Sequence, residues 1–185
     1  MARLRAMWGA WTQRDFIPMM AGGNCPTGVL GQVSGVIELA EQIKAGEAPQ
    51  DLQRIYVPVG SACTVSGLIL GVVFVQEYLK WNVLKNVQIV GCVVHEKIAR
   101  LDRIFNFHLN PLLGFMPLTI THSVITACRM LKQLGGPDLE DDCRKFLRTR
   151  VQLRCDAGVV GIYGGHSELS RKASQHYDAH GVVKE

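Results

Sequence analysis

Residues 54–80 have the sequence RIYVPVGSACTVSGLILGVVFVQEYLK, and this stretch decides the fold class. Its first part, Arg54–Val59, is rich in β-branched residues and predicts a buried strand. Its last part, from about Val65 to Leu79, is continuously apolar over a helical length and predicts a helix. The loop between them, Gly60–Thr64, consists of small residues. A strand, a short loop and a helix in this order are typical of parallel α/β proteins.

The same alternation continues along the rest of the chain. Further strands are predicted at Asn86–Val94 and Thr149–Arg154. Helices are predicted at Val29–Ala45, His95–Phe105, His122–Leu134, Asp138–Leu147 and Glu168–His180. Leu109–Leu118 carries two prolines and is expected to be a loop, and Asp138 is expected to cap the helix that it begins. We therefore expect a three-layer α/β fold with a mostly parallel sheet and helices on both faces, in a single domain over residues 1–185.

Composition excludes several classes of protein. The chain has 185 residues, of which 48% are hydrophobic and 19% charged, so it buries a core without disulfides and is not a disordered chain. The formal net charge is +4. The densest basic run, between Arg144 and Arg154, follows three acids and has no interleaved aromatic residues apart from Phe146, so no nucleic-acid partner is expected.

Cysteine usage and hydropathy indicate a compartment. No two of the six cysteines have the C-x-x-C spacing of a zinc or redox site, which suits a reducing environment and predicts no metal site. The longest apolar run, Val65–Val75, is far shorter than a membrane span. No signal peptide is recognised, so a cytoplasmic location without a membrane partner is expected, and an organelle stays open.

The loop at residues 60–64 is the strongest candidate for chemistry. The free N–H groups of a helix that follows a parallel strand converge on one point, and the helix dipole adds positive charge there. Small residues let an anion approach the backbone, and the hydroxyls of Ser61 and Thr64 add donors. The segment is a phosphate cradle in physical terms, although it lacks the lysine of a nucleotide P-loop. The alternative is an ordinary strand-to-helix turn built from small residues.

Two other segments also combine glycines with polar residues. Residues 16–43 contain Gly22-Gly23-Asn24 before a predicted helix. Glycines have no side chain, so the backbone there permits either the close approach of a ligand or close packing of another element. Residues 161–167 surround Tyr163 with glycines, and this tyrosine is either functional or part of the core or rim. A serine hydrolase is not expected, because neither serine-containing turn has the G-x-S-x-G pattern.

Taken together, the three segments resemble one family of pyridoxal-phosphate enzymes, that of D-cysteine desulfhydrase and 1-aminocyclopropane-1-carboxylate deaminase, which has the tryptophan synthase β-subunit fold. Its I-P-x-G-G-(S/N), G-x-x-G-Y and E-x-x-x-Q motifs match Ile17-Pro18, Gly22-Gly23-Asn24, Gly28, Gly31, Glu38 and Gln42. Its phosphate loop, G-S-G-G-T-x-A-G-L, matches Gly60–Leu68, and its D-P-x-Y-x-G-K turn matches the segment around Tyr163. The resemblance spans about residues 14–180.

The resemblance implies a cofactor, a site and a reaction class. The cofactor is pyridoxal phosphate, whose phosphate would be held by Gly60, Ser61, Ala62, Cys63 and Thr64. Asn24 would lie near the cofactor entrance. Tyr163 would be the catalytic tyrosine that faces the cofactor. The implied reaction is that of a lyase or deaminase acting on a small amino acid, and the implied assembly is a homodimer or an association through exposed sheet edges.

The departures from the family pattern concern catalysis. Two glycines of the phosphate loop are Ala62 and Cys63, Gly164 replaces a residue that contacts the pyridine nitrogen, and His166 replaces a lysine. The family's Schiff-base lysine lies upstream of the I-P-x-G-G motif, and no lysine of this chain matches it. The resemblance therefore implies the C-terminal part of a larger enzyme, inactive as this chain. The alternatives are a non-catalytic α/β protein that binds a ligand or self-associates, and a serine or threonine dehydratase of the same fold superfamily.

Overall fold

The computed structural model describes residues 20–94 and 115–154, together with Glu168, Arg171, Lys172 and Gln175. Its elements, in chain order, are η1 (Ala21–Gly23), α2 (Pro26–Ala45), β1 (Arg54–Val59), α3 (Cys63–Val73), η2 (Phe74–Tyr78), η3 (Asn82–Leu84), β2 (Gln88–Val93), α5 (Phe115–Gln133), α6 (Glu140–Arg150) and β3 (Val151–Arg154). The helical prediction for the C-terminal segment agrees with the four residues described there, which are helical. The expectations for residues 1–19, 95–114 and 155–167, including that for Tyr163, lie outside the described residues.

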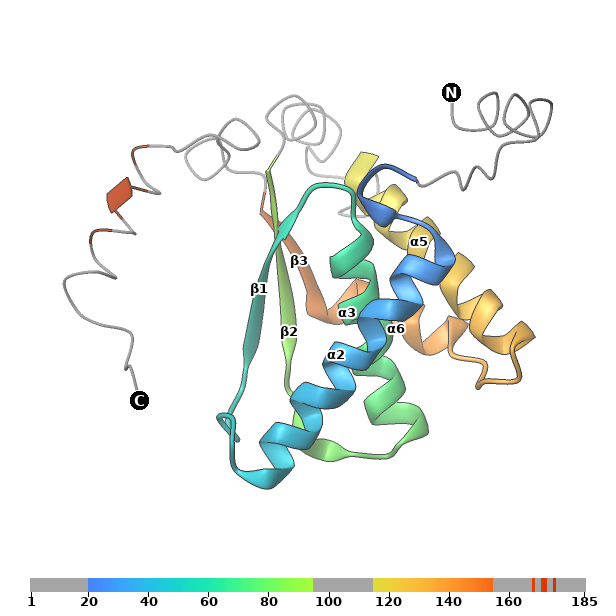
Figure 1. Cartoon of the computed structure of the whole chain (residues 1–185), viewed down its shortest axis with the longest axis horizontal. Helices are drawn as coiled ribbons and strands as arrows, with labels where there is room; N and C mark the ends of the chain where they lie inside the picture. Colours follow the sequence, from blue (N-terminus) through green and yellow to red (C-terminus); the bar gives the residue numbers. More distant parts are fainter. Residues whose placement is uncertain (1–19, 95–114, 155–167, 169–170, 173–174, 176–185) are drawn as a thin grey trace, which may run out of the picture.

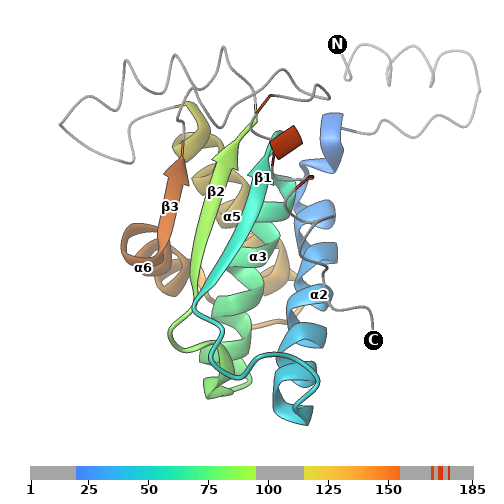
Figure 2. The same cartoon turned by 90° about the vertical axis from the view of Figure 1, so that its left-hand side faces the viewer.

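The three strands form a parallel sheet in the order β1-β2-β3. Tyr56 pairs with Val90, which pairs with Gln152, so the register is continuous across the sheet. All four long helices cover the same face of this sheet (Figure 1; Figure 2). The described part is thus an α/β arrangement, as predicted, with one helical layer on a parallel sheet. A helical layer on the opposite face stays a prediction.

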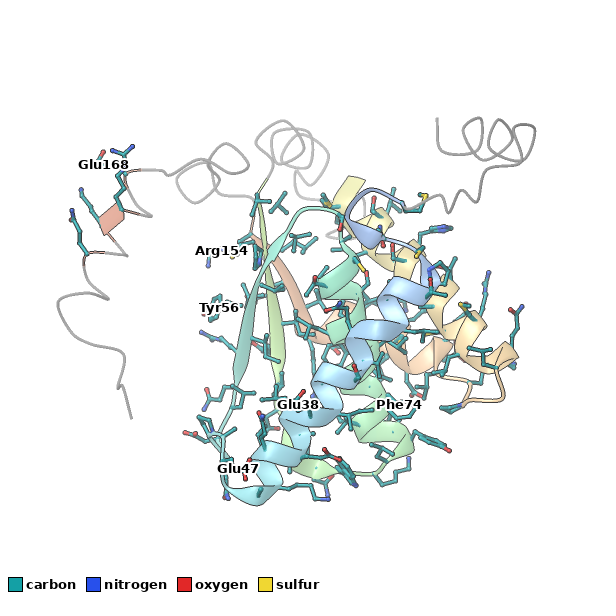
Figure 3. The ribbon with its side chains drawn as sticks, in the orientation of Figure 1. Glu38, Glu47, Tyr56, Phe74, Arg154 and Glu168 are labelled. Atoms are coloured by element: carbon teal, nitrogen blue, oxygen red, sulfur yellow. The ribbon has the colours of Figure 1, made fainter. Side chains whose placement is uncertain are left out.

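The alternation of side chains along β1 explains which face is covered. Val57 and Val59 are buried in the core, whereas Tyr56 is 63% exposed. The side chain of Tyr56 points away from the helices (Figure 3). Pro58, on the same outward face, is tolerated because β1 is an edge strand of the described sheet, where a missing backbone donor breaks no ladder.

The helix α3 is buried on nearly all sides and lies at the centre of the helical layer. Its core residues include Val65, Ile69 and Val72, each at most 1% exposed. A helix that is apolar all round is typical of the interior of a layered protein. At its C-terminal end α3 continues into the π-helical turn η2.

Helices α2 and α3 approach closely through two glycines of α3. A Cβ added at Gly67 would lie 2.2 Å from the Cβ of Gln32, and one added at Gly71 would lie 2.6 Å from Cγ2 of Val36. No side chain larger than hydrogen fits at either position without a shift of α2. This crossing fixes the N-terminus of α2 beside the N-terminus of α3, which is where the candidate site lies.

Several predicted boundaries differ from the structure. Helix α2 begins at Pro26 instead of Val29, because proline fits the first turn of a helix. The loop predicted at Leu109–Leu118 is wrong in its last part, since α5 begins at Phe115 and Pro117 occupies its first turn. Asp138 is not the cap of α6, whose N-cap position is Leu139. The carboxylate of Asp138 instead accepts a hydrogen bond from the N–H of Glu140 at 3.4 Å.

Candidate phosphate-binding site

The predicted phosphate loop lies at the carboxyl end of β1 and leads directly into α3. Ligands of open parallel α/β sheets bind at this edge. Ala62, the N-cap residue of α3, has φ 72° and is left-handed. An L-residue is strained at this φ by about 1 kcal/mol or more. The loop therefore has a backbone conformation that favours glycine, although an alanine occupies it.

The N-terminus of α3 is not capped by a side chain of the N-cap residue. The N–H of Cys63 makes a long hydrogen bond of 3.4 Å to Oγ of Ser61. For the N–H groups of Thr64 and Val65, no acceptor is found among residues 20–94 and 115–154. Thr64 is exposed, so its hydroxyl is accessible from solvent. Uncapped N–H groups at a helix N-terminus attract an anion through both hydrogen bonding and the helix dipole.

The structure brings the first two predicted segments together. The hydroxyl of Ser61 donates a hydrogen bond to the carbonyl of Gly22 at 3.1 Å, and the thiol of Cys63 donates one to the carbonyl of Gly23 at 3.2 Å. The contact is tight, since a Cβ on Gly22 would lie 2.3 Å from the Cβ of Ser61. The turn at residues 21–23 therefore lies directly on the β1–α3 loop, and the Ser61 hydroxyl is already engaged.

Two buried polar atoms near these loops have no hydrogen-bond partner. They are Oδ1 of Asn24 and Oγ of Ser66. Ser66 lies one turn into α3 and is fully buried, while Asn24 directly follows the glycine turn. Buried polar atoms are almost always hydrogen-bonded, so these two atoms are exceptions. The Ser66 hydroxyl could donate to an anion, whereas the amide oxygen of Asn24 can only accept a hydrogen bond. Sequence reasoning missed Ser66, although a serine inside an otherwise apolar helix was a signal.

Two cysteines at the site differ in acidity. The pKa of Cys25 is lowered, mainly because the hydroxyl of Thr27 lies 3.1 Å from its sulfur. The pKa of Cys63 is raised, first by burial and then by the proximity of Cys25. Cys63 therefore acts as a neutral hydrogen-bond donor to the glycine turn and not as a nucleophile.

Four of the described lysines lie away from this edge of the sheet. Lys44 ends α2 and stacks on the ring of Trp81, and Lys80 pairs with Glu77 beyond the far end of α3. Lys85 precedes β2 and is thus at the amino edge. Lys132 pairs with Asp138 between α5 and α6. Within the described residues, no group of three or more metal-ligating side chains is present either.

A concavity of about 90 Å³ lies between η2 and α6, far along α3 from its N-terminus. Gln76 donates a hydrogen bond to the carbonyl of Leu84, and Arg150 donates one to the carbonyl of Lys85. These two side chains of the hollow therefore fix the segment that precedes β2. This hollow lies at the amino edge of the sheet, away from the candidate site, and its contacts are structural.

In the described part of the chain, no helix is long and apolar enough to cross a bilayer.

Comparison with models of known families gives no match, and comparison with curated proteins gives none either.

Proposed function

We propose that this chain binds a phosphorylated cofactor of the pyridoxal-phosphate type at the N-terminus of α3. The observation that supports this most directly is the uncapped helix terminus, with the unpartnered hydroxyl of Ser66 one turn into the same helix as a candidate donor. The left-handed backbone at Ala62 adds support, because the resemblance places glycine at this position. Together these features support an anion site at the carboxyl edge of the sheet, where ligands of parallel α/β sheets bind.

The phosphate of the cofactor fits the described residues. The N–H groups of Thr64 and Val65 and the hydroxyl of Thr64 would hold it, and Ser61 would join them if its hydroxyl turned from Gly22. Gly60, Ala62 and Cys63 are small residues and would let the phosphate approach the backbone. When bound, pyridoxal phosphate supplies an electron sink for a carbanion on an amino-acid substrate.

Covalent attachment of the cofactor is not supported at this loop, because Lys44, Lys80, Lys85 and Lys132 lie away from this edge. We therefore propose phosphate-directed binding by this chain, with no turnover of an amino acid by the described residues alone. A lyase or deaminase of small amino acids, with Tyr163 as catalytic residue and a helical layer on both faces of the sheet, is the fuller form of the proposal. A homodimer in the cytoplasm belongs to the same proposal.

A second candidate function is that of a non-catalytic protein that associates with itself. It is favoured by the outward face of the sheet, where Tyr56 is 63% exposed and Pro58 is also exposed. Exposed apolar groups on an uncovered sheet favour association. In this case the Ser61–Gly22 hydrogen bond is a permanent structural contact, and the loop binds no ligand.

The two functions are distinguished by comparing pyridoxal phosphate with pyridoxal, which lacks the phosphate. We expect the phosphorylated form to raise the thermal unfolding midpoint of the purified chain, and inorganic phosphate to compete with it. Thr64→Val is expected to abolish the shift, whereas Thr149→Val, at an exposed position of α6, is expected to keep it. Equal effects of both vitamers, or no effect of either, would contradict phosphate-directed binding. Sedimentation at several concentrations tests self-association.

A further inference from the structure

We propose that Cys128 and Cys143 form a reversible intramolecular disulfide, which makes them an oxidative modification site between α5 and α6. The thiol of Cys128 donates a hydrogen bond to Sγ of Cys143, and the two sulfurs lie 3.6 Å apart. Both are free thiols in the structure. A disulfide needs an S–S separation of about 2.05 Å, so a small rotation or shift of the two side chains suffices.

The surroundings hold the two sulfurs in this position. Glu140 accepts hydrogen bonds from Arg129 at 3.0 Å and from Arg144 at 2.6 Å, and Lys132 pairs with Asp138 at 2.6 Å. The Arg129–Glu140 and Lys132–Asp138 pairs join α5 to the start of α6 and the residue before it, on the side of the sulfur pair toward the helix connection, whereas Arg144–Glu140 lies within α6. The connection between the helices is tight as well, because Gly135 has φ 87°. The packing of the α5–α6 hairpin therefore holds the sulfurs of Cys128 and Cys143 close to each other.

The pair is also shielded from competing reactions. Cys128 is 1% exposed and Cys143 is fully buried. The pKa of Cys128 is lowered by its hydrogen bond with Cys143, whereas the pKa of Cys143 is raised by the same neighbour and by burial. The lower pKa favours Cys128 as the thiolate, which then accepts the hydrogen bond from the thiol of Cys143.

The oxidation balances with hydrogen peroxide as the oxidant. The thiolate of Cys128 attacks one peroxide oxygen, which breaks the O–O bond and gives a sulfenic acid and hydroxide. The sulfur of Cys143 then attacks the sulfur of the sulfenic acid, and its proton leaves with the hydroxyl group as water. In sum, two thiols and one peroxide give one disulfide and two waters. Because both sulfurs are buried, the reaction requires an opening of the helices that admits peroxide.

The consequence of the bond is a locked α5–α6 hairpin. The closed loop contains the residues from 128 to 143, and cross-links of this length stabilise mainly by restricting the unfolded chain. We expect the thermal unfolding midpoint to rise by roughly 5–10 °C on oxidation and to return after reduction. Because α5 and α6 both pack on α3, the lock also stiffens the layer that carries the candidate site.

The test is peroxide titration of the full chain, followed by intact mass and peptide mapping without reduction. We expect the mass to fall by two hydrogens, a cross-link between the peptides that contain Cys128 and Cys143, and recovery with dithiothreitol. Cys143→Ser is expected to abolish the cross-link, and Cys92→Ser, on the outward face of the sheet, to leave it unchanged. The proposal is overturned if Cys128 and Cys143 stay titratable as thiols while Cys25 oxidises. If Cys143→Ser does not fold, the map of the unaltered chain decides alone.

Discussion

The hydroxyl of Ser61 and the carbonyl of Gly22 are joined by a hydrogen bond of 3.1 Å that spans 39 positions of the sequence. This bond connects the glycine turn before α2 to the loop at the carboxyl end of β1. It has two consequences for the candidate site. It fixes the turn against the β1–α3 loop, and it engages a hydroxyl that could otherwise donate a hydrogen bond to a bound anion. A ligand at the N-terminus of α3 must therefore either bind beside this turn or displace it.

Gly22→Ala is expected to break this arrangement. The new Cβ would lie 2.3 Å from the Cβ of Ser61, in addition to the strain of an alanine at φ 64°. We expect a loss of about 2–4 kcal/mol in the free energy of unfolding, measured by urea denaturation, and a loss of any phosphate affinity.

Gly23→Ala is the matched control for this prediction. Its φ is 66°, so the backbone strain is the same, but no atom lies within 4 Å of the added Cβ. We expect a loss of only about 1–2 kcal/mol. Equal losses in Gly22→Ala and Gly23→Ala would show that the contact with Ser61 contributes nothing.

Gly71→Ala is expected to destabilise the protein although alanine favours helices. The added methyl would lie 2.6 Å from Cγ2 of Val36 and separate α2 from α3, at about 1–3 kcal/mol. Gly35→Ala is the opposite case, because it lies on the exposed side of α2 with nothing within 4 Å. It is expected to stabilise by about 0.5–1 kcal/mol. The two free energies of unfolding should thus differ in sign, and a gain in both would show that the helices separate without penalty.

The strand–loop–helix unit was predictable because its signals are local. The β-branched run Arg54–Val59 matches β1 at both ends, and the alternation of strands and helices gave the parallel sheet. The helix boundaries are less predictable, because Pro26 and Pro117 are typical of loops, although a helix accepts proline in its first turn.

Contacts between distant segments were not predictable from local pattern. Nothing in the sequence near Gly22 indicates that Ser61 lies against it, and nothing near Cys128 indicates the distance to Cys143. Such pairs depend on how α2 crosses α3 and how the α5–α6 hairpin closes, which are properties of packing. The loop at residues 60–64 was predicted as a phosphate cradle from local features, but the engagement of its serine follows only from the tertiary contact.

Ser66→Ala is expected to stabilise the protein while weakening any ligand binding. The Ser66 hydroxyl is fully buried and has no partner, so its removal abolishes a desolvation penalty. Alanine also has the higher helix propensity. We expect a gain of about 1 kcal/mol in the free energy of unfolding, measured without ligand. A loss of stability would show that the hydroxyl has a partner in solution, and unchanged affinity for pyridoxal phosphate would exclude it from the site.

The ion pairs between α5 and α6 predict a dependence of stability on pH. The pKa of Glu140 is lowered from its ordinary value of 4.5 by hydrogen bonds from Arg129 and Arg144, and that of Asp138 is lowered from 3.8, mainly by Lys132. A carboxylate whose pKa is lower in the folded state binds more protons when unfolded. Its contribution is therefore present above the ordinary pKa and is lost as the pH falls through the lowered one.

We expect the thermal unfolding midpoint to fall on acidification from about pH 5 to about pH 3, and to fall less in Glu140→Gln because the neutral amide does not titrate. Asp141→Asn is the control, since this carboxylate, on the same turn of α6, makes no ion pair within the described residues. Its profile is expected to follow that of the unaltered chain. Added salt should reduce the difference between Glu140→Gln and the unaltered chain, because these pairs are solvent-exposed and screened. Identical acid profiles for all three proteins at low salt would show that the pairs on Glu140 do not hold α5 against α6.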